Sequence, residues 1–398
     1  MTAYPDVFIV GAARTPIGKF LGGLSTLKAS DLGAIAIREA LQRANLGGDD
    51  VDEVLMGHVV QGGQGQAPAR QAQIKAGINP SIGAVTINKV CGSGLKAVMM
   101  GAQAIKAGDA HSVVAGGQES MSTAPHYLFS GRLGQKLGDT VMKDGAVMDG
   151  LWCSFNDCHM IELAQYTVEK AGLHRQELDV FSADSHRKAA AAIASCRFSK
   201  EIVAVTIPQR KGDPVVIAKD ESVRPDTTPE TLAKLPAVTR DKGGAITAGN
   251  APGLNDGGAA LVLMSGERVR ERGAKPLARV VAYATGGGDP KDLFFAPIDA
   301  VQKLMKKMNV TIDHFDLIEA NEAFAAQALA DGKALGWNWD RVNVNGGAVA
   351  LGHPIGASGA RVLVTLLYAL EQQGKRTGLA TLCLGGGNAV ALAVERVA

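Results

Sequence analysis

The sequence predicts an α/β fold built from two similar halves. Apolar strand-like segments alternate with helix-like segments, a pattern that predicts βαβ units and a mostly parallel sheet. The chain has 398 residues, too many for one small core, and combines 49 glycines with few aromatic residues, which suits close packing of helices on sheets. In the second half, strand, Gly-rich segment, helix and strand recur in the order seen in the first, which indicates an internal duplication.

The first half alternates regularly. Spacing of apolar residues predicts strands at 7–10, 54–56, 83–87 and 112–115, and helices at 32–44, 67–76 and 95–107. Gly116-Gly117 is expected to form a turn after the last of these strands.

Residues from about 123 to 175 break this alternation and predict a loop insertion. The segment is rich in Gly, His, Met and Asp, and long insertions in α/β folds often cover ligands. A plain surface excursion is the alternative, but the cluster Trp152, Phe155, His159 and Met160 favours a covering role. Cys153 and Cys158-His159 invite a metal site, yet a second Cys or His pair is missing, so zinc is disfavoured.

The second half repeats the first. Strands are expected at 315–319, 341–344 and 379–383, a Gly-rich segment at 346–359, a helix at 361–371 and a turn at 385–387. The segment 88–94, which contains Cys91, and the segment that contains His353 then occupy equivalent elbows. In a fold of two paired halves these elbows would face each other.

Composition and termini exclude several classes of protein. The net charge of +2 disfavours nucleic acid as a partner, although a local basic patch for a phosphorylated ligand stays open. Five scattered cysteines are not a disulfide framework and suggest a reducing compartment, so we expect a cytoplasmic protein. No secretory signal, membrane-spanning stretch or terminal address is expected. A GxGxxG motif in the register of a dinucleotide fold is also missing.

Cys91 is the strongest candidate for chemistry. It stands between a strand and a helix, where the N–H groups and the dipole of the helix are expected to lower its pKa and give a thiolate near neutral pH. His353, fixed in a Gly-rich loop beside Pro354, would activate such a nucleophile. We therefore expect an enzyme with a cysteine nucleophile.

Three further residues have two interpretations each. Cys383 by itself fits a small buried residue, but it stands at a strand end beside a Gly-rich turn, where α/β sites form. Asn321 is either a plain helix cap or a residue that orients a water or an oxyanion. Cys196, in an Ala-rich helix, is expected to be structural.

Together these segments resemble the thiolase family, the acetyl-CoA acetyltransferases and 3-ketoacyl-CoA thiolases. The resemblance runs the whole chain, through motifs at 10–18, 88–94, 115–122, 247–250, 321–325, 346–359 and 383–387. It implies duplicated βαβαβαββ halves that form a layered α-β-α-β-α core with an inserted loop domain. The implied segments are 1–122, 123–250 (the insertion and the return to the first half) and 251–398.

The resemblance also implies catalytic roles. Cys91 accepts the acyl group, His353 activates it, and Cys383 is the acid/base at the α-carbon of acetyl-CoA. Asn321 holds a water that forms one oxyanion hole with His353, and the backbone N–H groups of Cys91 and Gly385 form the second. Loss of one such donor costs roughly 10²–10³ in turnover.

Coenzyme A contacts carry over from the family less completely. The matching positions are Arg224 near the adenine, with Leu151 and Thr231, then Ala248, Gly249 and Leu254 along the pantetheine, His159 and Met160 in the covering loop, and Phe324 in the pocket wall. Departures are Pro252 in place of the usual Ser, Ile161-Glu162-Leu163 in place of small residues, and Phe294-Phe295 beside the acyl pocket. They leave the acyl-chain length open.

The leading expectation is reversible Claisen condensation of two acetyl-CoA to acetoacetyl-CoA and CoA through an acyl-cysteine, with no metal and no cofactor besides the CoA thioesters. The alternative is a degradative thiolase for longer 3-ketoacyl-CoA in fatty-acid β-oxidation. A thiolase-like lipid carrier without turnover is disfavoured by the three reactive residues, and Asn321 and Cys383 disfavour the related ketoacyl synthases. The family implies a homodimer or homotetramer without nucleic-acid or membrane partners.

Overall fold

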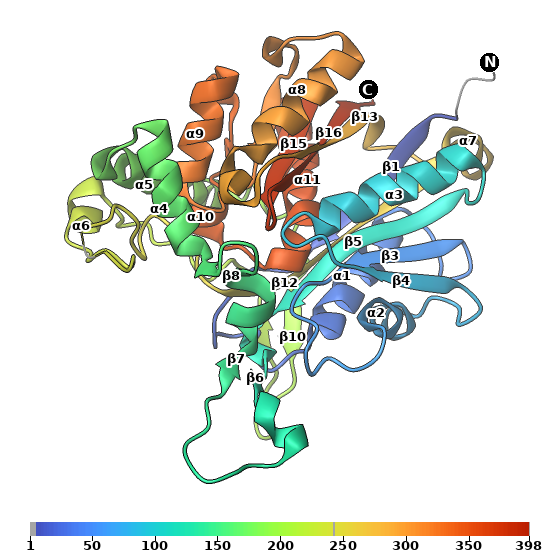
Figure 1. Cartoon of the computed structure of the whole chain (residues 1–398). Coiled ribbons are helices and arrows are strands. Elements are labelled where there is room, and N and C mark those ends of the chain that lie inside the picture. Colours follow the sequence, from blue (N-terminus) through green and yellow to red (C-terminus); the bar gives the residue numbers. More distant parts are fainter. Residues whose placement is uncertain (1–4, 242, 398) are drawn as a thin grey trace.

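The computed structural model describes residues 5–241 and 243–397, which form two halves that share one ten-stranded sheet (Figure 1). The strands run in the order β14-β15-β16-β13-β1-β12-β5-β3-β4, with β2 attached to β12. The halves meet where β1 pairs with β13 over Phe8 and Ile9. The predicted α/β class and the two-half arrangement are confirmed.

The N-terminal half follows the predicted alternation closely. Its elements are β1 (Val7–Arg14), β2 (Gly18–Lys19), α1 (Ala29–Arg43), β3 (Glu53–Gly57), α2 (Pro68–Ala76), β4 (Gly83–Ile87), α3 (Ser93–Ala107), β5 (Ser112–Ser120) and β12 (Asn255–Ser265). Strand β12 lies between β1 and β5, although it follows the insertion in the chain. The segment bounds 1–122, 123–250 and 251–398 stay a prediction.

The C-terminal half repeats the layout. It contains α7 (Gly266–Arg272), β13 (Ala278–Gly287), η4 (Pro290–Phe295), α8 (Ala296–Met308), η5 (Ile312–His314), β14 (Leu317–Ala320), α9 (Ala325–Leu335), η6 (Trp339–Arg341), α10 (Ala348–Leu351), α11 (Ile355–Gln372), β15 (Thr377–Leu384) and β16 (Asn388–Arg396). The strand predicted at 341–344 is wrong: only an isolated bridge between Val342 and Ile318 forms there.

The sheet is mixed, so the prediction of a mostly parallel sheet is wrong. Strand β3 is parallel to β4 and β5, and β14 is parallel to β15, but β1, β12, β13 and β16 pair in antiparallel fashion with their neighbours. Local alternation reveals only the strands joined by a crossover helix. Strand β12 follows the whole insertion in the chain, and no local sequence pattern predicts its direction.

Helices α3 and α11 pack against each other and form the central layer. Helix α11 contacts β5 and β12 of one half and β14 and β15 of the other, α1 and α2 cover the outer face of the first half, and α8 covers β13 and β16. The layers therefore follow the expected α-β-α-β-α order. The N-terminal parts of α3 and α11 pack closely together. A Cβ atom on Gly94 would lie only 2.6 Å from the backbone N of Ala360.

Gly117 does not form the predicted turn but continues β5 beneath the start of α11. A Cβ there would lie 2.0 Å from the carbonyl oxygen of Gly356. Glycine at this position allows the strand and the helix to approach closely.

We expect Gly117→Ala to lower the free energy of unfolding by about 1–3 kcal/mol or more, because β5 and α11 must move apart. Gly83→Ala in β4 is the matched control, since nothing lies within 4 Å of its Cβ position. Denaturant unfolding of both variants measures the difference. Equal losses in the two variants would contradict the packing argument.

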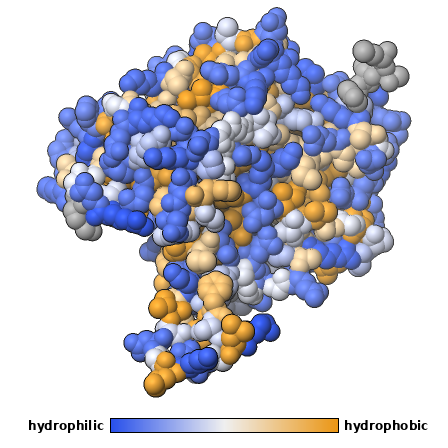
Figure 2. All heavy atoms as spheres, viewed as in Figure 1, coloured by the Kyte–Doolittle hydropathy of each residue, from blue (hydrophilic) through white to orange (hydrophobic). Residues whose placement is uncertain are grey.

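The insertion forms a separate lobe and a protruding arm. Its elements are η1 (Met121–Thr123), β6 (His126–Tyr127), η2 (Phe129–Leu133), β7 (Lys143–Asp144), the π-helical turn η3 (Val147–Leu151), β8 (Trp152–Cys153), β9 (Cys158–His159), α4 (Met160–Ala171), α5 (Arg175–Ala194), β10 (Val205–Ile207), β11 (Val215–Ile217) and α6 (Pro229–Ala233). Residues 126–144 form the arm, which stands away from the body and carries apolar side chains (Figures 1 and 2). Among the described residues, no helix is long and apolar enough to cross a membrane.

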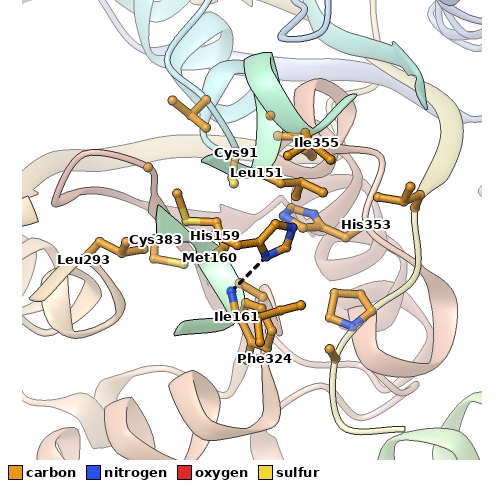
Figure 3. A pocket seen from close by; sticks show the side chains of 18 of the residues that line it. Cys91, Leu151, His159, Met160, Ile161, Leu293, Phe324, His353, Ile355 and Cys383 are labelled. Atoms are coloured by element: carbon orange, nitrogen blue, oxygen red, sulfur yellow. Dashed lines mark hydrogen bonds between the residues drawn. The ribbon is translucent and has the colours of Figure 1, made fainter. Parts of the chain in front are cut away.

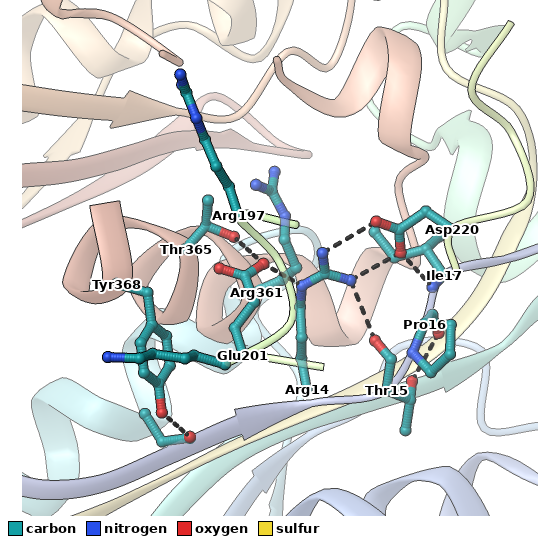
Figure 4. A network of polar contacts seen from close by, with 12 residues as sticks. Arg14, Thr15, Pro16, Ile17, Arg197, Glu201, Asp220, Arg361, Thr365 and Tyr368 are labelled. Carbon is teal, nitrogen blue, oxygen red and sulfur yellow. Dashed lines mark hydrogen bonds and ion pairs between the residues drawn. The ribbon is translucent and has the colours of Figure 1, made fainter. Parts of the chain in front are cut away.

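A buried ionic network ties the end of the insertion to the core (Figure 4). Arg14 at the end of β1 donates from Nε to Glu201 at 2.6 Å and from both terminal nitrogens to Asp220 at 2.7 and 2.9 Å. Asp220 also accepts from the backbone N of Ile17, and Glu201 accepts from Thr365 of α11. The two carboxylates raise the pKa of Arg14 although burial opposes this. Removal of one partner would leave a buried charge unpaired, so the network fixes the insertion on the core.

Candidate active site

A cavity of about 370 Å³ lies where the two halves and the insertion meet (Figure 3). Most of its wall is apolar, which is typical of ligand pockets with a few convergent polar groups. The predicted site residues that line it are Cys91, Leu151, His159, Met160, Leu254, Phe324, His353, Cys383 and Gly385. Cys91 and His353 come from the two elbows, so the prediction that these face each other is confirmed.

The backbone before Cys91 adopts a strained turn. Val90 has φ of +46°, in the left-handed region that a β-branched residue rarely occupies. Ser93 stabilises the turn: its hydroxyl accepts from the backbone N of Lys89 and donates to the carbonyl of Val90. The turn sets Cys91 just before the N-cap Gly92 of α3, with its side chain toward the cavity.

The structure contradicts the expected thiolate at Cys91. Burial in the apolar cavity raises the pKa of the thiol to about 12, although the backbone N–H groups of Gly385 and of Cys91 itself act in the opposite direction. The charge of Glu119 raises it further. Cys91 lies two residues before α3, and the desolvation of a buried anion outweighs the helix terminus. Cys91 is therefore a neutral thiol, and a nucleophilic role for it would require a base.

His353 has the geometry that a base would require. Its Nδ1 lies 2.6 Å from the hydroxyl oxygen of Ser358, and this hydroxyl donates to the carbonyl of Pro354. Because the hydroxyl proton is used on Pro354, Nδ1 carries the ring proton and donates it to Ser358. Nε2 then holds a free lone pair, and no group of the described residues forms a hydrogen bond with this buried atom. Burial, aided by the charge of Arg361, lowers the pKa of His353 to about 3, so the ring is neutral.

Cys383 stands at the end of β15 with 1% of its side chain exposed. Burial raises its pKa well above the ordinary value, and nearby Cys91 and Asp331 raise it further. It is a neutral thiol, poised to give a proton rather than to take one in the resting state. The turn predicted after it is present, and Gly385 in this turn directs its N–H at Cys91.

Asn321 is fully buried, and neither its side-chain oxygen nor its side-chain nitrogen has a hydrogen-bond partner within the described part of the chain. It does not cap α9, whose N-cap is Phe324, so the plain cap interpretation is wrong. Asn321 does not line the cavity itself. An unpartnered buried amide is costly unless a water or a ligand satisfies it, which favours the second interpretation, a residue that holds a water.

Two residues that support the site had no predicted role. Ser358 fixes the His353 ring, as described above. Glu119 at the end of β5 accepts from the backbone N of Val59, Val60 and Gly356, at 3.2, 3.3 and 2.9 Å, and so joins the first half to the His353 loop. A Ser five residues after His353 and a lone acid at a strand end are the sequence signals that would have indicated them.

The remaining predicted coenzyme A residues lie outside the cavity wall. Arg224, Thr231 and Ala248 are exposed and Gly249 is buried. Arg224 contacts His186 through its backbone N at 3.2 Å and its guanidinium at 3.1 Å.

A residue from each of the three segments that depart from the family pattern lines the cavity. Ile161, Pro252 and Phe294 line it, and the ring of Phe294 packs edge-on against Phe324 with centroids 5.2 Å apart. Cys153 and Cys158 are free, and the described residues contain no group of three or more His, Cys, Asp or Glu side chains arranged to hold a metal ion.

Comparisons with known proteins agree with this geometry. The family model described as "Thiolase, N-terminal domain" matches residues 7–267, and "Thiolase, C-terminal domain" matches residues 274–396. An acetyl-CoA acetyltransferase of Allochromatium vinosum is 52% identical over 393 residues, which is 98% of this chain and 99% of that protein. That of Escherichia coli is 50% identical over 391 residues, with 98% of each chain covered.

A solved structure matches as well. The crystal structure of the Bacillus anthracis acetyl-CoA acetyltransferase superimposes with a TM-score of 0.97 at 42% sequence identity, and the match covers 100% of both chains. The likeness therefore extends over the insertion and both halves.

Proposed function

Because this chain belongs to the thiolase family, we propose that it is an acyltransferase that catalyses the reversible Claisen condensation of two acetyl-CoA to acetoacetyl-CoA and CoA. The observation that carries the proposal is the neutral His353, whose unpartnered Nε2 shares one apolar cavity with the thiols of Cys91 and Cys383. Nucleophile, base and acid are then in one place.

In the cleavage direction, His353 Nε2 takes the proton of Cys91, and the sulfur attacks the 3-keto carbon of acetoacetyl-CoA. The backbone N–H groups of Cys91 and Gly385 stabilise the resulting oxyanion. The bond between C2 and C3 then breaks, which leaves an acetyl group on Cys91 and the enolate of acetyl-CoA.

Cys383 completes the cycle. Its thiol protonates the enolate carbon, while Nε2–H of His353 and a water held by Asn321 stabilise the enolate oxygen. The Cys383 thiolate then takes the proton of an incoming CoA thiol, whose sulfur attacks the acetyl group. The bond between the acetyl group and the Cys91 sulfur breaks, and this sulfur takes back its proton from His353. Condensation is the reverse of these steps, and a neutral Cys383 at rest fits the cleavage direction directly.

The reaction as written needs only CoA thioesters and this chain's own residues, without a further cofactor. We propose that Leu151, His159, Met160, Leu254 and Phe324 contact the acyl and pantetheine parts in the cavity, and that Arg224, Thr231, Ala248 and Gly249 contact the rest of CoA outside it. The family relation supports these assignments.

The cavity favours short acyl groups, because Leu293, Phe294 and Phe324 form part of its wall. We expect kcat/KM for thiolysis of acetoacetyl-CoA to exceed that for a long-chain 3-ketoacyl-CoA by about tenfold or more. A thiolysis series of increasing chain length measures this. A preference for the long chain would instead support a degradative thiolase of fatty-acid β-oxidation.

We also propose that the protein forms homodimers or homotetramers in the cytoplasm. The arm exposes Phe129, Leu133 and Leu137 to 64%, 90% and 108%, and apolar side chains that are exposed together often mark protein–protein contacts. Five free cysteines suit a reducing compartment. Sedimentation of the intact chain tests the assembly and cell fractionation tests the location; a monomer or an exported protein would contradict the proposal.

A further inference from the structure

Cys153 and Cys158 stand directly opposite each other in the two-stranded hairpin of β8 and β9. The antiparallel register pairs Cys153 with Cys158 and Trp152 with His159. Directly opposite residues in such a pair have Cα atoms about 4.5–5.5 Å apart, and their side chains leave the same face of the hairpin. This separation lies inside the range of about 4.4–6.8 Å that a disulfide spans.

From this register we infer that Cys153 and Cys158 are a disulfide-forming pair, a modification site on the hairpin that borders the cavity. Both thiols are free in the structure. The proposal concerns the insertion alone and uses none of the catalytic residues.

The two sulfurs differ in access, which sets the order of the reaction. Cys153 is 2% exposed, and its sulfur accepts from Nδ2 of Asn156 at 3.3 Å. Cys158 is only half-buried and follows the exposed turn 154–157. A small disulfide in solution therefore reaches Cys158 first, and Cys153 is the resolving thiol.

The chemistry balances with a low-molecular-weight disulfide as the oxidant. The Cys158 thiolate attacks it, forms a mixed disulfide and releases one small thiol. Cys153 then loses its proton, attacks the sulfur of Cys158 and releases the second small thiol. Two protein thiols are oxidised to one disulfide, and the small disulfide is reduced to two thiols.

The environment of Cys158 makes this exchange depend on pH. Burial raises the pKa of Cys158, and the neighbouring Cys153 raises it further, whereas Arg240 acts in the opposite direction. The attacking thiolate is therefore scarce at neutral pH, and the link should form faster as the pH rises.

A disulfide between Cys153 and Cys158 would restrict the movement of one side of the cavity wall. Leu151 directly precedes β8, and His159 ends β9; both line the cavity. The His159 ring also accepts from the backbone N of Ile161 and so caps α4. Cys153 itself packs in the cluster that contains Phe324 and Cys383. A covalent link between the strands would fix the spacing of Leu151 and His159.

The test exposes the intact protein to mixtures of oxidised and reduced glutathione, quenches with acid and alkylating reagent, and maps the peptides. We expect an internal link between Cys153 and Cys158 that dithiothreitol reverses and that forms faster at higher pH. Cys196 is exposed and serves as the internal control, since it should end as a mixed disulfide with glutathione. Two separately alkylated thiols at 153 and 158, or a link between other cysteines, would overturn the proposal.

Two variants check the order of attack. Cys153→Ser should stop at a glutathione adduct on Cys158, and Cys158→Ser should leave the buried Cys153 unmodified. The reverse pattern would overturn the order in which the two thiols react. Peptide mapping requires no turnover, so failure of the proposed function would leave this test intact.

Discussion

Replacement of Cys91 by alanine is expected to stop both condensation and thiolysis. The variant lacks the sulfur that carries the acyl group, and the other thiol of the cavity, Cys383, is assigned to the proton transfer at carbon. Loss of a catalytic nucleophile typically lowers kcat by roughly 10⁴–10⁶-fold. Steady-state thiolysis of acetoacetyl-CoA measures the loss.

The matched control is Cys196→Ser. Cys196 is exposed and lies outside the cavity, so its loss should leave thiolysis unchanged. It also lies after the end of α5 with φ of +55°, not within that helix as predicted. Undiminished turnover in Cys91→Ala, in protein with native unfolding behaviour, would refute the nucleophile.

Cys383→Ser is the second large effect, and it should separate the two halves of the reaction. Serine keeps the shape of the side chain but is too weak an acid to exchange protons with carbon. We expect condensation and thiolysis to fall by about 10²–10⁴-fold. Transfer of acetyl from acetyl-CoA to Cys91 should slow much less, because a CoA thiolate is stable enough to leave before it is protonated, whereas the carbon step requires the proton of Cys383.

Equal losses in transfer and in condensation would contradict an acid/base role of Cys383 that matters more at carbon than at sulfur. Isotope exchange between CoA and acetyl-CoA reports the transfer step, and exchange of the α-protons of acetyl-CoA with solvent deuterium reports the carbon step. The account predicts that Cys383→Ser loses the second far more than the first.

Local sequence patterns predicted elements well where one segment decides its own structure. The strand 83–87 has the predicted bounds, and the helices at 67–76 and 95–107 differ from α2 and α3 by one or two residues at the start. Their patterns are set by burial of one face and by flanking glycines. The pairing of elbows followed from the recurring order of elements alone.

The errors share a cause in contacts between distant segments. Gly117 continues β5, where the strand packs closely against Gly356 of α11. Val342 makes a single bridge and does not extend into a strand. No local sequence window contains these partners.

The pKa of Cys91 was also mispredicted because it depends on distant segments of the chain. The helix after Cys91 was a valid reason for a lowered pKa, but desolvation comes from a cavity formed by both halves and the insertion. The sequence predicted Cys91, His353 and Cys383 as the reacting residues, whereas their neutral state depends on burial in the assembled cavity. Ser358 and Glu119 were missed because they act through His353 and its loop.

The most direct measurement is acid-quenched mass spectrometry of Cys383→Ser after incubation with acetyl-CoA. The account predicts one acetyl group, carried by the peptide that contains Cys91, and its removal when CoA is added. No acetyl group on this peptide, or an acetyl group on a different residue, would contradict the claim that Cys91 carries the acyl group between CoA thiols.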